Sequence, residues 1–235
     1  MNVAEHMMMQ ILTLSKYTCR SVGLMKPDSH WDRTPELCDE DTFSVNWAGM
    51  KNIKSLHDMT IGILGFGEVG YELALRLKPF GSSILYNKRK KLPSSAESKI
   101  GLHFRNRSEI FKESDVLCSL LPLVTGIEGT IDKQAIDMMK PGSFIAHCGA
   151  SSMVNEDDAA TALKSGQLGG FAAETFAWEP VEPGNPLLAL TVDPQINILL
   201  TPHIAVGSVT RPWFEKVYSN IINFVEGRSL AGRVI

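Results

Sequence analysis

Three glycines in the first third of the chain have the spacing of a phosphate-binding turn. Gly65, Gly67 and Gly70 form the pattern G-x-G-x-x-G. In such a pattern the first glycine permits a tight turn, the second lets the backbone approach a pyrophosphate, and the third lets a following helix pack closely on the preceding strand. The N–H groups and dipole of that helix favour an anion at its N-terminus. The chemistry that these residues indicate is dinucleotide binding.

The segments on either side of the turn are those that such a site requires. Residues 60–64 are a short apolar run, typical of a strand buried on both faces. From Glu68 to Phe80 the apolar residues recur at helical spacing, Gly81 is placed to end that helix, and residues 83–86 predict a second strand. This context favours dinucleotide binding over the alternative, a glycine turn with a purely structural role.

The end of the second predicted strand indicates which dinucleotide binds. An Asp or Glu about 20 residues beyond the glycines would bind the ribose 2′-hydroxyl of NAD, but no acid occurs between Glu72 and Glu97. That window holds Asn87, Lys88 and Arg89 instead, and the two cations are placed to neutralise a 2′-phosphate. The sequence therefore favours NADP over NAD. The alternative is that the basic run is a solvated loop.

Short apolar runs alternate with amphipathic segments along the rest of the chain. Further strands are predicted at 101–104, 116–121, 143–147, 171–173 and 196–200, and helices at 108–111, 133–139, 156–164 and 212–227, with an opening helix that begins at Asn2. Residues 92–98 predict a turn region, and residues 22–58 an ordered loop wrapped on the surface. This alternation predicts an α/β fold with a doubly wound, mostly parallel sheet, which binds ligands at the carboxyl ends of its strands.

Composition narrows the class of protein. The 235 residues carry a net charge of −3 and are 44% apolar, which is ordinary for a globular chain with a sizeable core. The slight acidity argues against nucleic acid as a partner. Four cysteines without metal-ligand spacing predict a reducing, cytoplasmic location and no metal site. No apolar run reaches the length of a membrane span, so no membrane partner is expected.

The residues that follow the predicted strands match a known pattern. The glycine turn is followed by Leu121-Pro122-Leu123, Met139-Lys140-Pro141-Gly142, the segment 169–180 and Thr201-Pro202-His203-Ile204-Ala205. Together these motifs resemble the D-isomer-specific 2-hydroxyacid dehydrogenase family over nearly the whole chain. The resemblance implies a Rossmann-type fold. It also implies an oxidoreductase that transfers a hydride between NAD(P)H, with NADPH favoured, and a small-molecule 2-oxo acid or related carbonyl compound.

The resemblance also implies roles for individual residues. His203 would exchange a proton with the substrate carbonyl, and Glu179 would bind the other nitrogen of that ring. Glu174 takes the place of an Asp that faces the nicotinamide carboxamide. The implied coenzyme-binding set is Gly65, Phe66, Gly67, Glu68, Val69, Gly70, Asn87, Lys88, Arg89, Leu121, Pro122, Cys148, Gly149, Glu174 and His203.

The first departure from the family pattern concerns the substrate. After the strand at 143–147 the family has Asn-x-x-Arg-Gly, in which the Arg binds the substrate carboxylate. Here residues 147–151 read His-Cys-Gly-Ala-Ser, so Ala150 takes the Arg position. Arg211 and His147 are candidate replacements. The alternative is a substrate that lacks this carboxylate.

The second departure concerns the start of the chain. The resemblance implies a separate N-terminal lobe that closes over the substrate, and we expect the given residues to hold little of it. We expect a linking helix in 1–21, a coenzyme domain in 22–205, and in 206–235 a helix that would return to that lobe. Both terminal helices should then expose apolar surface, which favours a homodimer. The competing functions are a non-catalytic dinucleotide-binding module or truncated form that lacks turnover, and another Rossmann dehydrogenase, such as a 3-hydroxyacid type.

Overall fold

A computed structural model describes residues 2–29, 31, 33–207 and 211–229, with the side chains of 211–217 left out. Within these residues one seven-stranded parallel sheet has the order β3-β2-β1-β4-β5-β6-β7. The strands are β1 (Thr60–Leu64), β2 (Ser83–Asn87), β3 (Leu102–Phe104), β4 (Val116–Ser119), β5 (Ser143–His147), β6 (Leu168–Ala173) and β7 (Ile198–Leu200). The strand order reverses between β1 and β4, which confirms the predicted doubly wound, Rossmann-type fold.

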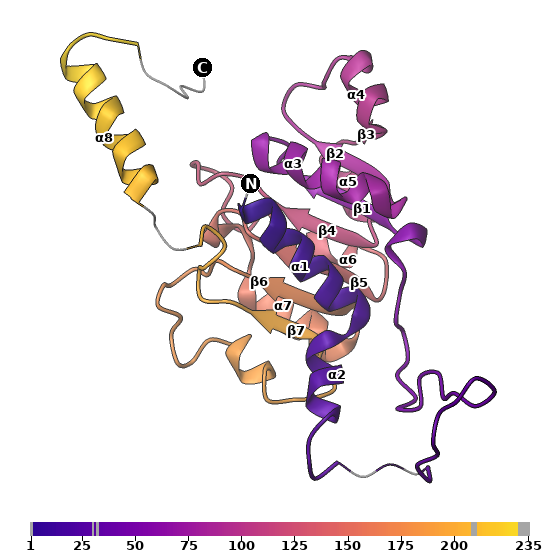
Figure 1. Ribbon diagram of the computed structural model, residues 1–235. Coiled ribbons are helices and arrows are strands. Elements are labelled where there is room, and N and C mark those ends of the chain that lie inside the picture. Colours follow the sequence, from indigo (N-terminus) through magenta and orange to yellow (C-terminus); the bar gives the residue numbers. More distant parts are fainter. Residues whose placement is uncertain (1, 30, 32, 208–210, 230–235) are drawn as a thin grey trace.

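Helices cover both faces of the sheet (Figure 1). The helices are α1 (Asn2–Lys16), α2 (Thr18–Leu24), α3 (Glu68–Leu77), α4 (Ser94–Ile100), α5 (Arg107–Glu113), α6 (Lys133–Asp137), α7 (Glu156–Ser165) and α8 (Arg211–Val225). Side chains of α1, α3 and α4 share one apolar cluster with one face of the strands. Those of α5, α6 and α7 form a second cluster on the other face. No helix in the described residues is both long and apolar enough to cross a membrane.

Local chemistry accounts for several helix ends. The Asn155 side chain accepts a hydrogen bond from Asp158 N at the start of α7, and Gly166 ends that helix at a φ of +79°. Gly81 has a φ of +77° after the 3-10 turn that extends α3. Residues 94–100 form α4, so the turn region expected at 92–98 is wrong over most of its length.

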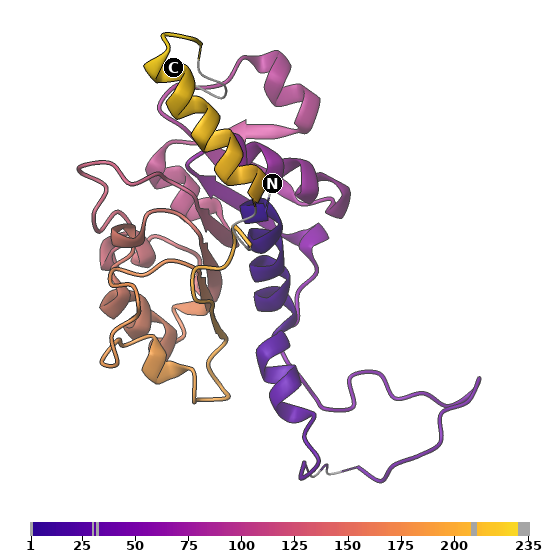
Figure 2. The same cartoon turned by 60° about the vertical axis from the view of Figure 1, so that its left-hand side comes forward.

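Two expectations about the peripheral segments are also wrong. The opening helix α1 does not expose an apolar face, because Met7, Ile11 and Leu14 are fully buried against the sheet and α3. Of the two terminal helices, α8 carries the exposed apolar residues, such as Phe224, and stands apart in Figure 1. Residues 33–49 are not wrapped on the surface: Figures 1 and 2 show them reaching away from the sheet. Lys54, further along the same segment, does contact the core, since its main-chain N–H donates to Ser15 O at 3.0 Å.

The glycine turn between β1 and α3 has the geometry that the sequence predicts. Gly65 has a φ of +98°, and a Cβ there would lie 2.6 Å from Leu121 N. At Gly70 a Cβ would lie 3.2 Å from the Ile63 side chain, so α3 packs closely on β1. A Cβ on Gly67 would meet nothing within 4 Å, because this residue faces open space. The fold itself therefore requires the first glycine, the third allows close packing of the helix on the strand, and the second is not required by the fold.

We expect Gly65→Ala to lower the free energy of unfolding by about 2–4 kcal/mol, since it combines a left-handed φ with backbone overlap. Gly67→Ala is the matched control and should cost less than about 1 kcal/mol, as for a change at a helix N-cap. Urea unfolding of both variants measures the difference. Equal costs for the two substitutions would contradict this description of the turn.

Candidate active site

The predicted site residues lie at one edge of the molecule. Because the strands are parallel, the residues that follow β1, β2, β4, β5, β6 and β7 meet at the carboxyl edge of the sheet. Main-chain hydrogen bonds join the loops that follow these strands. Ala150 N donates to Leu121 O at 2.9 Å, and Glu174 N donates to His147 O at 2.9 Å. Gly149 belongs to the same contact, since its Cβ would lie 3.0 Å from Leu121 O. Leu121 is half-buried beside it, and Pro122 is exposed.

The glycine turn can accept the phosphates of a dinucleotide. The first-turn N–H groups of α3, which begins at Glu68 and Val69, have no carbonyl within their own helix to bind. They adjoin the open space next to Gly67, so an anion fits there without a steric conflict. Phe66 contributes differently, because its ring is buried against Tyr86 at a centroid distance of 4.9 Å. Its role is to support the turn from within the core.

The basic residues after β2 lie beside this turn. Asn87 O accepts hydrogen bonds from Gly65 N at 3.3 Å and Phe66 N at 3.1 Å. The Asn87 amide donates to Arg105 O at 2.8 Å, so it is engaged in holding β2 to the next connection. Lys88 and Arg89 are exposed, and neither pairs with a carboxylate in the part of the chain that the structure describes. Two cations thus follow the strand that adjoins the glycine turn.

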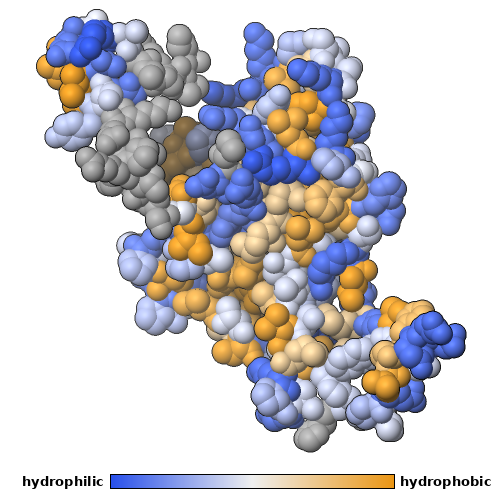
Figure 3. All heavy atoms as spheres, in the orientation of Figure 1, coloured by the Kyte–Doolittle hydropathy of each residue, from blue (hydrophilic) through white to orange (hydrophobic). Residues whose placement is uncertain are grey.

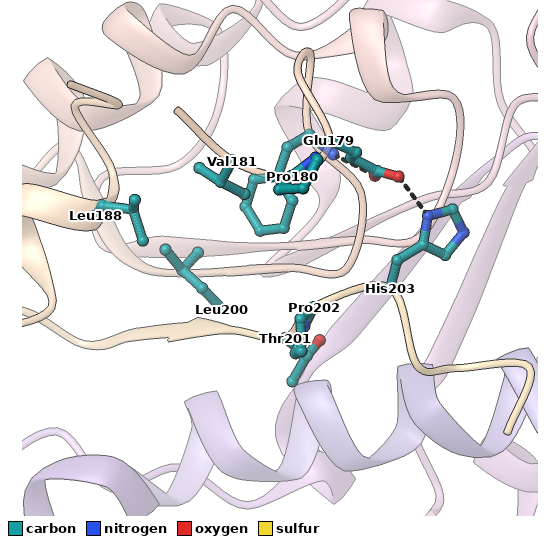
Figure 4. Close-up of a pocket in the computed structure, with 9 residues that line it drawn as sticks. Glu179, Pro180, Val181, Leu188, Leu200, Thr201, Pro202 and His203 are labelled. Atoms are coloured by element: carbon teal, nitrogen blue, oxygen red, sulfur yellow. Dashed lines mark hydrogen bonds and ion pairs between the residues drawn. The ribbon is translucent and has the colours of Figure 1, made fainter. Parts of the chain in front are cut away.

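His203 and Glu179 are in direct contact. His203 Nδ1 lies 2.6 Å from Glu179 Oε2, and Phe176 N donates to Glu179 Oε1 at 3.0 Å (Figure 4). An ionised carboxylate only accepts hydrogen bonds, so Nδ1 carries a proton and donates it to Glu179. The His203 side chain is 53% exposed. Its Nε2 is therefore the nitrogen left to exchange a proton with another molecule.

An apolar pocket of about 480 Å³ adjoins this pair. Figure 4 shows Val181, Leu188 and Leu200 facing one another across it, with Glu179 and His203 at one end. Phe176 also lines it. The imidazole thus stands at the border between an apolar wall and open space.

Glu174 lies directly after β6 and is 1% exposed. The Thr201 hydroxyl donates to Glu174 Oε2, and Ala205 N donates to Glu174 Oε1. His6 Nε2 of α1 lies 3.1 Å from Glu174 Oε2. Both carboxylate oxygens are therefore engaged within the protein.

His147 belongs to a buried polar network that the sequence analysis missed. Thr175 Oγ1 donates to Gly149 O at 2.8 Å, so its contact of 3.0 Å with His147 uses the ring's Nε2–H as donor. Ser119 Oγ then donates to His147 Nδ1 at 2.9 Å. The one available signal was that Ser119 and Thr175 are polar residues at strand ends.

His147 cannot replace the missing arginine. Burial lowers the pKa of His147 to about 4, so the ring is neutral near pH 7, and both its nitrogens are engaged. Ala150 is 8% exposed and carries no charge to the cleft. The other candidate anchor, Arg211, has a side chain outside the described residues.

The two cysteines near the site are not reactive thiolates. Cys148 Sγ donates to Gln10 Oε1 at 3.4 Å, and burial raises the pKa of this thiol to about 12. Burial also raises the pKa of Cys118. In the described part of the chain, no group of three or more His, Cys, Asp or Glu side chains is arranged to hold a metal. Of the titratable side chains described at this edge, His203 and Glu179 form a pair that is open to solvent.

These features define a dinucleotide-binding domain of the Rossmann class. Residues 32–205 match the family described as D-isomer specific 2-hydroxyacid dehydrogenase, NAD binding domain. The chain belongs to that family. The match agrees with the resemblance that the strand-end motifs indicate.

Similar proteins support the assignment. A glyoxylate reductase of Pyrococcus furiosus is 34% identical over 176 residues, covering 73% of this chain and 50% of that protein. A glyoxylate/hydroxypyruvate reductase B of Pectobacterium carotovorum is 34% identical over 156 residues, covering 66% of this chain and 46% of that protein. A Granulicella M. formate dehydrogenase has the same fold, with a TM-score of 0.82 at 23% identity over 98% of this chain and 57% of that one. The chain spans about half the length of the curated relatives it matches.

The buried His147 should make stability depend on pH. The neutral ring is favoured in the folded state, whereas the unfolded chain binds a proton below its ordinary pKa of 6.5. Stability is therefore complete above pH 6.5 and falls as the pH drops toward 4, by roughly 3 kcal/mol in total. Urea unfolding between pH 7.5 and 4.5 should show this decline, and His147→Gln should flatten it. The exposed His103→Gln serves as the control that keeps it; an identical decline in both variants would refute the assignment.

Proposed function

We propose that this chain is the coenzyme-binding part of an oxidoreductase that transfers a hydride between NADPH and a 2-oxo acid or related carbonyl compound. The single observation that carries the proposal is the His203–Glu179 pair. It lies at the same edge of the sheet as a glycine turn with room for phosphates. Hydride transfer to a carbonyl also requires a proton at the carbonyl oxygen, and a fixed imidazole supplies it.

In this mechanism the bound nicotinamide would supply or accept the hydride, and the residues of the chain do the rest. The turn at Gly65 and the N-terminus of α3 bind the phosphates. Glu179 accepts a hydrogen bond from Nδ1 of His203 and fixes the tautomer and orientation of the ring. His203 Nε2–H donates its proton to the carbonyl oxygen during reduction and takes it back during oxidation. The buried network of Ser119, His147 and Thr175 keeps the backbone of Gly149 in place beside them.

His203→Gln should reduce kcat by roughly a hundredfold to ten-thousandfold, because an amide cannot transfer a proton. The dissociation constant of NADPH should stay within about threefold of wild type. NADPH oxidation is followed with a panel of 2-oxo acids and the matching aldehydes, and binding is measured by fluorescence titration.

The same panel of 2-oxo acids and aldehydes decides whether the protein is an enzyme or a non-catalytic binding module. A wild-type protein that binds coenzyme yet turns over none of these compounds would favour the non-catalytic dinucleotide-binding module.

Because position 150 holds an alanine and not a cation, we infer that the substrate class includes carbonyl compounds that lack the 2-carboxylate. Equal turnover of acids and aldehydes would support that inference, and a hundredfold preference for the acids would oppose it.

The preference for NADPH is proposed from Lys88 and Arg89. Both are exposed next to the turn, without carboxylate partners in the described chain, and no acid follows β2 to bind a ribose hydroxyl. A 2′-phosphate would lie between two cations there and would be repelled by an acid.

Lys88→Asp combined with Arg89→Ala should lower the ratio of NADPH to NADH affinity by at least about tenfold, since each charge-assisted bond contributes roughly 1.5–3 kcal/mol. Lys164→Asp combined with Lys133→Ala, on α7 and α6, makes the same change in net charge away from the turn and is the control. Calorimetric titration with both coenzymes measures the ratio. An unchanged ratio of NADPH to NADH affinity in the double variant would show that Lys88 and Arg89 belong to a solvated loop and do not bind the coenzyme.

A further part of the proposal concerns the domains, assembly and location of the whole protein. We propose that residues 22–205 form the coenzyme domain, that 1–21 and 206–235 connect it to a substrate lobe, and that the protein is a homodimer in the cytoplasm. The projecting residues 33–49 support self-association, because they expose Leu37, Phe43 and Val45. Figure 3 shows apolar side chains gathered on this projection at the lower right. Sedimentation of the protein measures the assembly.

A further inference from the structure

The imidazole of His203 projects from a turn that does not hold it firmly by itself. His203 has a φ of +51°, which is unusual for a residue with a side chain, and its N–H bonds back to Thr201 O at 3.0 Å. Among the described residues, the ring bonds only to Glu179. Glu179 is itself on a loop and 34% exposed. The direction of Nε2 therefore depends on whatever holds the two ends of the turn.

One buried carboxylate holds both ends. Glu174 accepts the Thr201 hydroxyl through Oε2 and the Ala205 main-chain N–H through Oε1. These two residues stand two positions before and two positions after His203. Because Glu174 follows β6 directly and is 1% exposed, it is anchored in the core rather than on the surface. The Glu174 side chain thus joins the two ends of the turn that carries His203.

The opening helix α1 adds a second anchor. His6 Nε2 lies 3.1 Å from Glu174 Oε2 and 3.0 Å from Thr201 Oγ1, and its side chain is 10% exposed. Four residues earlier, Asn2 Nδ2 donates to Val206 O at 2.9 Å, just beyond the turn. Since the apolar face of α1 is fully buried, these contacts connect the turn to the rigid core.

We propose that Glu174 is a positioning residue for His203, and not a ligand of the nicotinamide carboxamide. The assignment rests on the proposed function, in which His203 transfers the proton. The segment 174–179 then supplies two carboxylates with different tasks: Glu174 fixes the base of the turn, and Glu179 fixes the ring. His6 completes the first of these contacts from α1.

Side-chain length separates the two roles of residue 174. Aspartate is one methylene shorter, so it cannot reach Thr201 and Ala205 together, although the resemblance places an aspartate at this position as the nicotinamide contact. Glutamine keeps the length. Its carbonyl oxygen can accept from Ala205 N, while Thr201 can turn its hydroxyl to Ala173 O, which lies at 3.2 Å. A positioning role therefore tolerates Gln and not Asp, whereas a coenzyme ligand tolerates Asp.

The test compares Glu174→Asp, Glu174→Gln and, as a matched control in the same connection, Glu182→Asp. We expect Glu174→Asp to lower kcat at least tenfold with the NADPH dissociation constant within twofold of wild type. Glu174→Gln should retain kcat within threefold, and Glu182→Asp should match wild type. Wild-type kcat in Glu174→Asp, or a coenzyme dissociation constant changed more than fivefold in either Glu174 variant, would overturn the proposal.

A second readout does not depend on turnover. In protein labelled with 15N-histidine, the Nδ1–H proton that His203 donates to Glu179 gives a resonance that His203→Gln removes. This resonance should be lost or shifted in Glu174→Asp and in the isosteric Thr201→Val, and retained in Glu174→Gln. An unchanged resonance in Glu174→Asp and Thr201→Val would refute the positioning role. If the wild-type protein reduces no carbonyl compound, the proposed function fails while this readout still decides the role of Glu174.

Discussion

The close approach between the Gly65 turn and the backbone that leaves β4 is the constraint on which the rest of the site depends. A Cβ on Gly65 would overlap Leu120 and Leu121, so the two connections can meet only because residue 65 is glycine. Leu120 N donates to Leu64 O at 2.8 Å, and Asn87 O accepts from Gly65 N at 3.3 Å. The ends of β1, β2 and β4 are held together by these contacts. This arrangement directs the N-terminus of α3 at the open space beside Gly67.

A second convergence, at the ends of β5, β6 and β7, depends on buried polar groups rather than on glycine. Glu174 and His147 are each 1% exposed, and each bonds to residues from neighbouring connections. Such groups are stable in the core only when their hydrogen-bonding atoms find partners, so they fix the loops that supply those partners. His203 is exposed at the tip of one such loop. The fold therefore places a rigid network beneath a group that is free to meet another molecule.

The parallel, doubly wound character of the sheet follows from local sequence signals, and the buried network does not. Apolar runs such as 60–64 and glycines such as Gly65 and Gly166 act through their own backbone, so their positions are legible in the chain. The burial of α1 depends on contacts with distant strands and with α3, which periodicity does not encode. The contact of His203 with Glu179 was expected only from the family resemblance. The engagement of Glu174 by His6 was not expected, because 168 positions separate the two and no local pattern joins them.

The central claim is that a nicotinamide dinucleotide binds with its phosphates against the turn that contains Gly67. Calorimetric titration of folded protein with NADPH and with NADH tests it most directly, using wild type and Gly67→Val. The account predicts saturable heat at one coenzyme per wild-type chain, and at least tenfold weaker binding in Gly67→Val, whose side chain would fill the open space without disturbing the fold. Absence of heat with both coenzymes, or equal affinity in the two proteins, would contradict it.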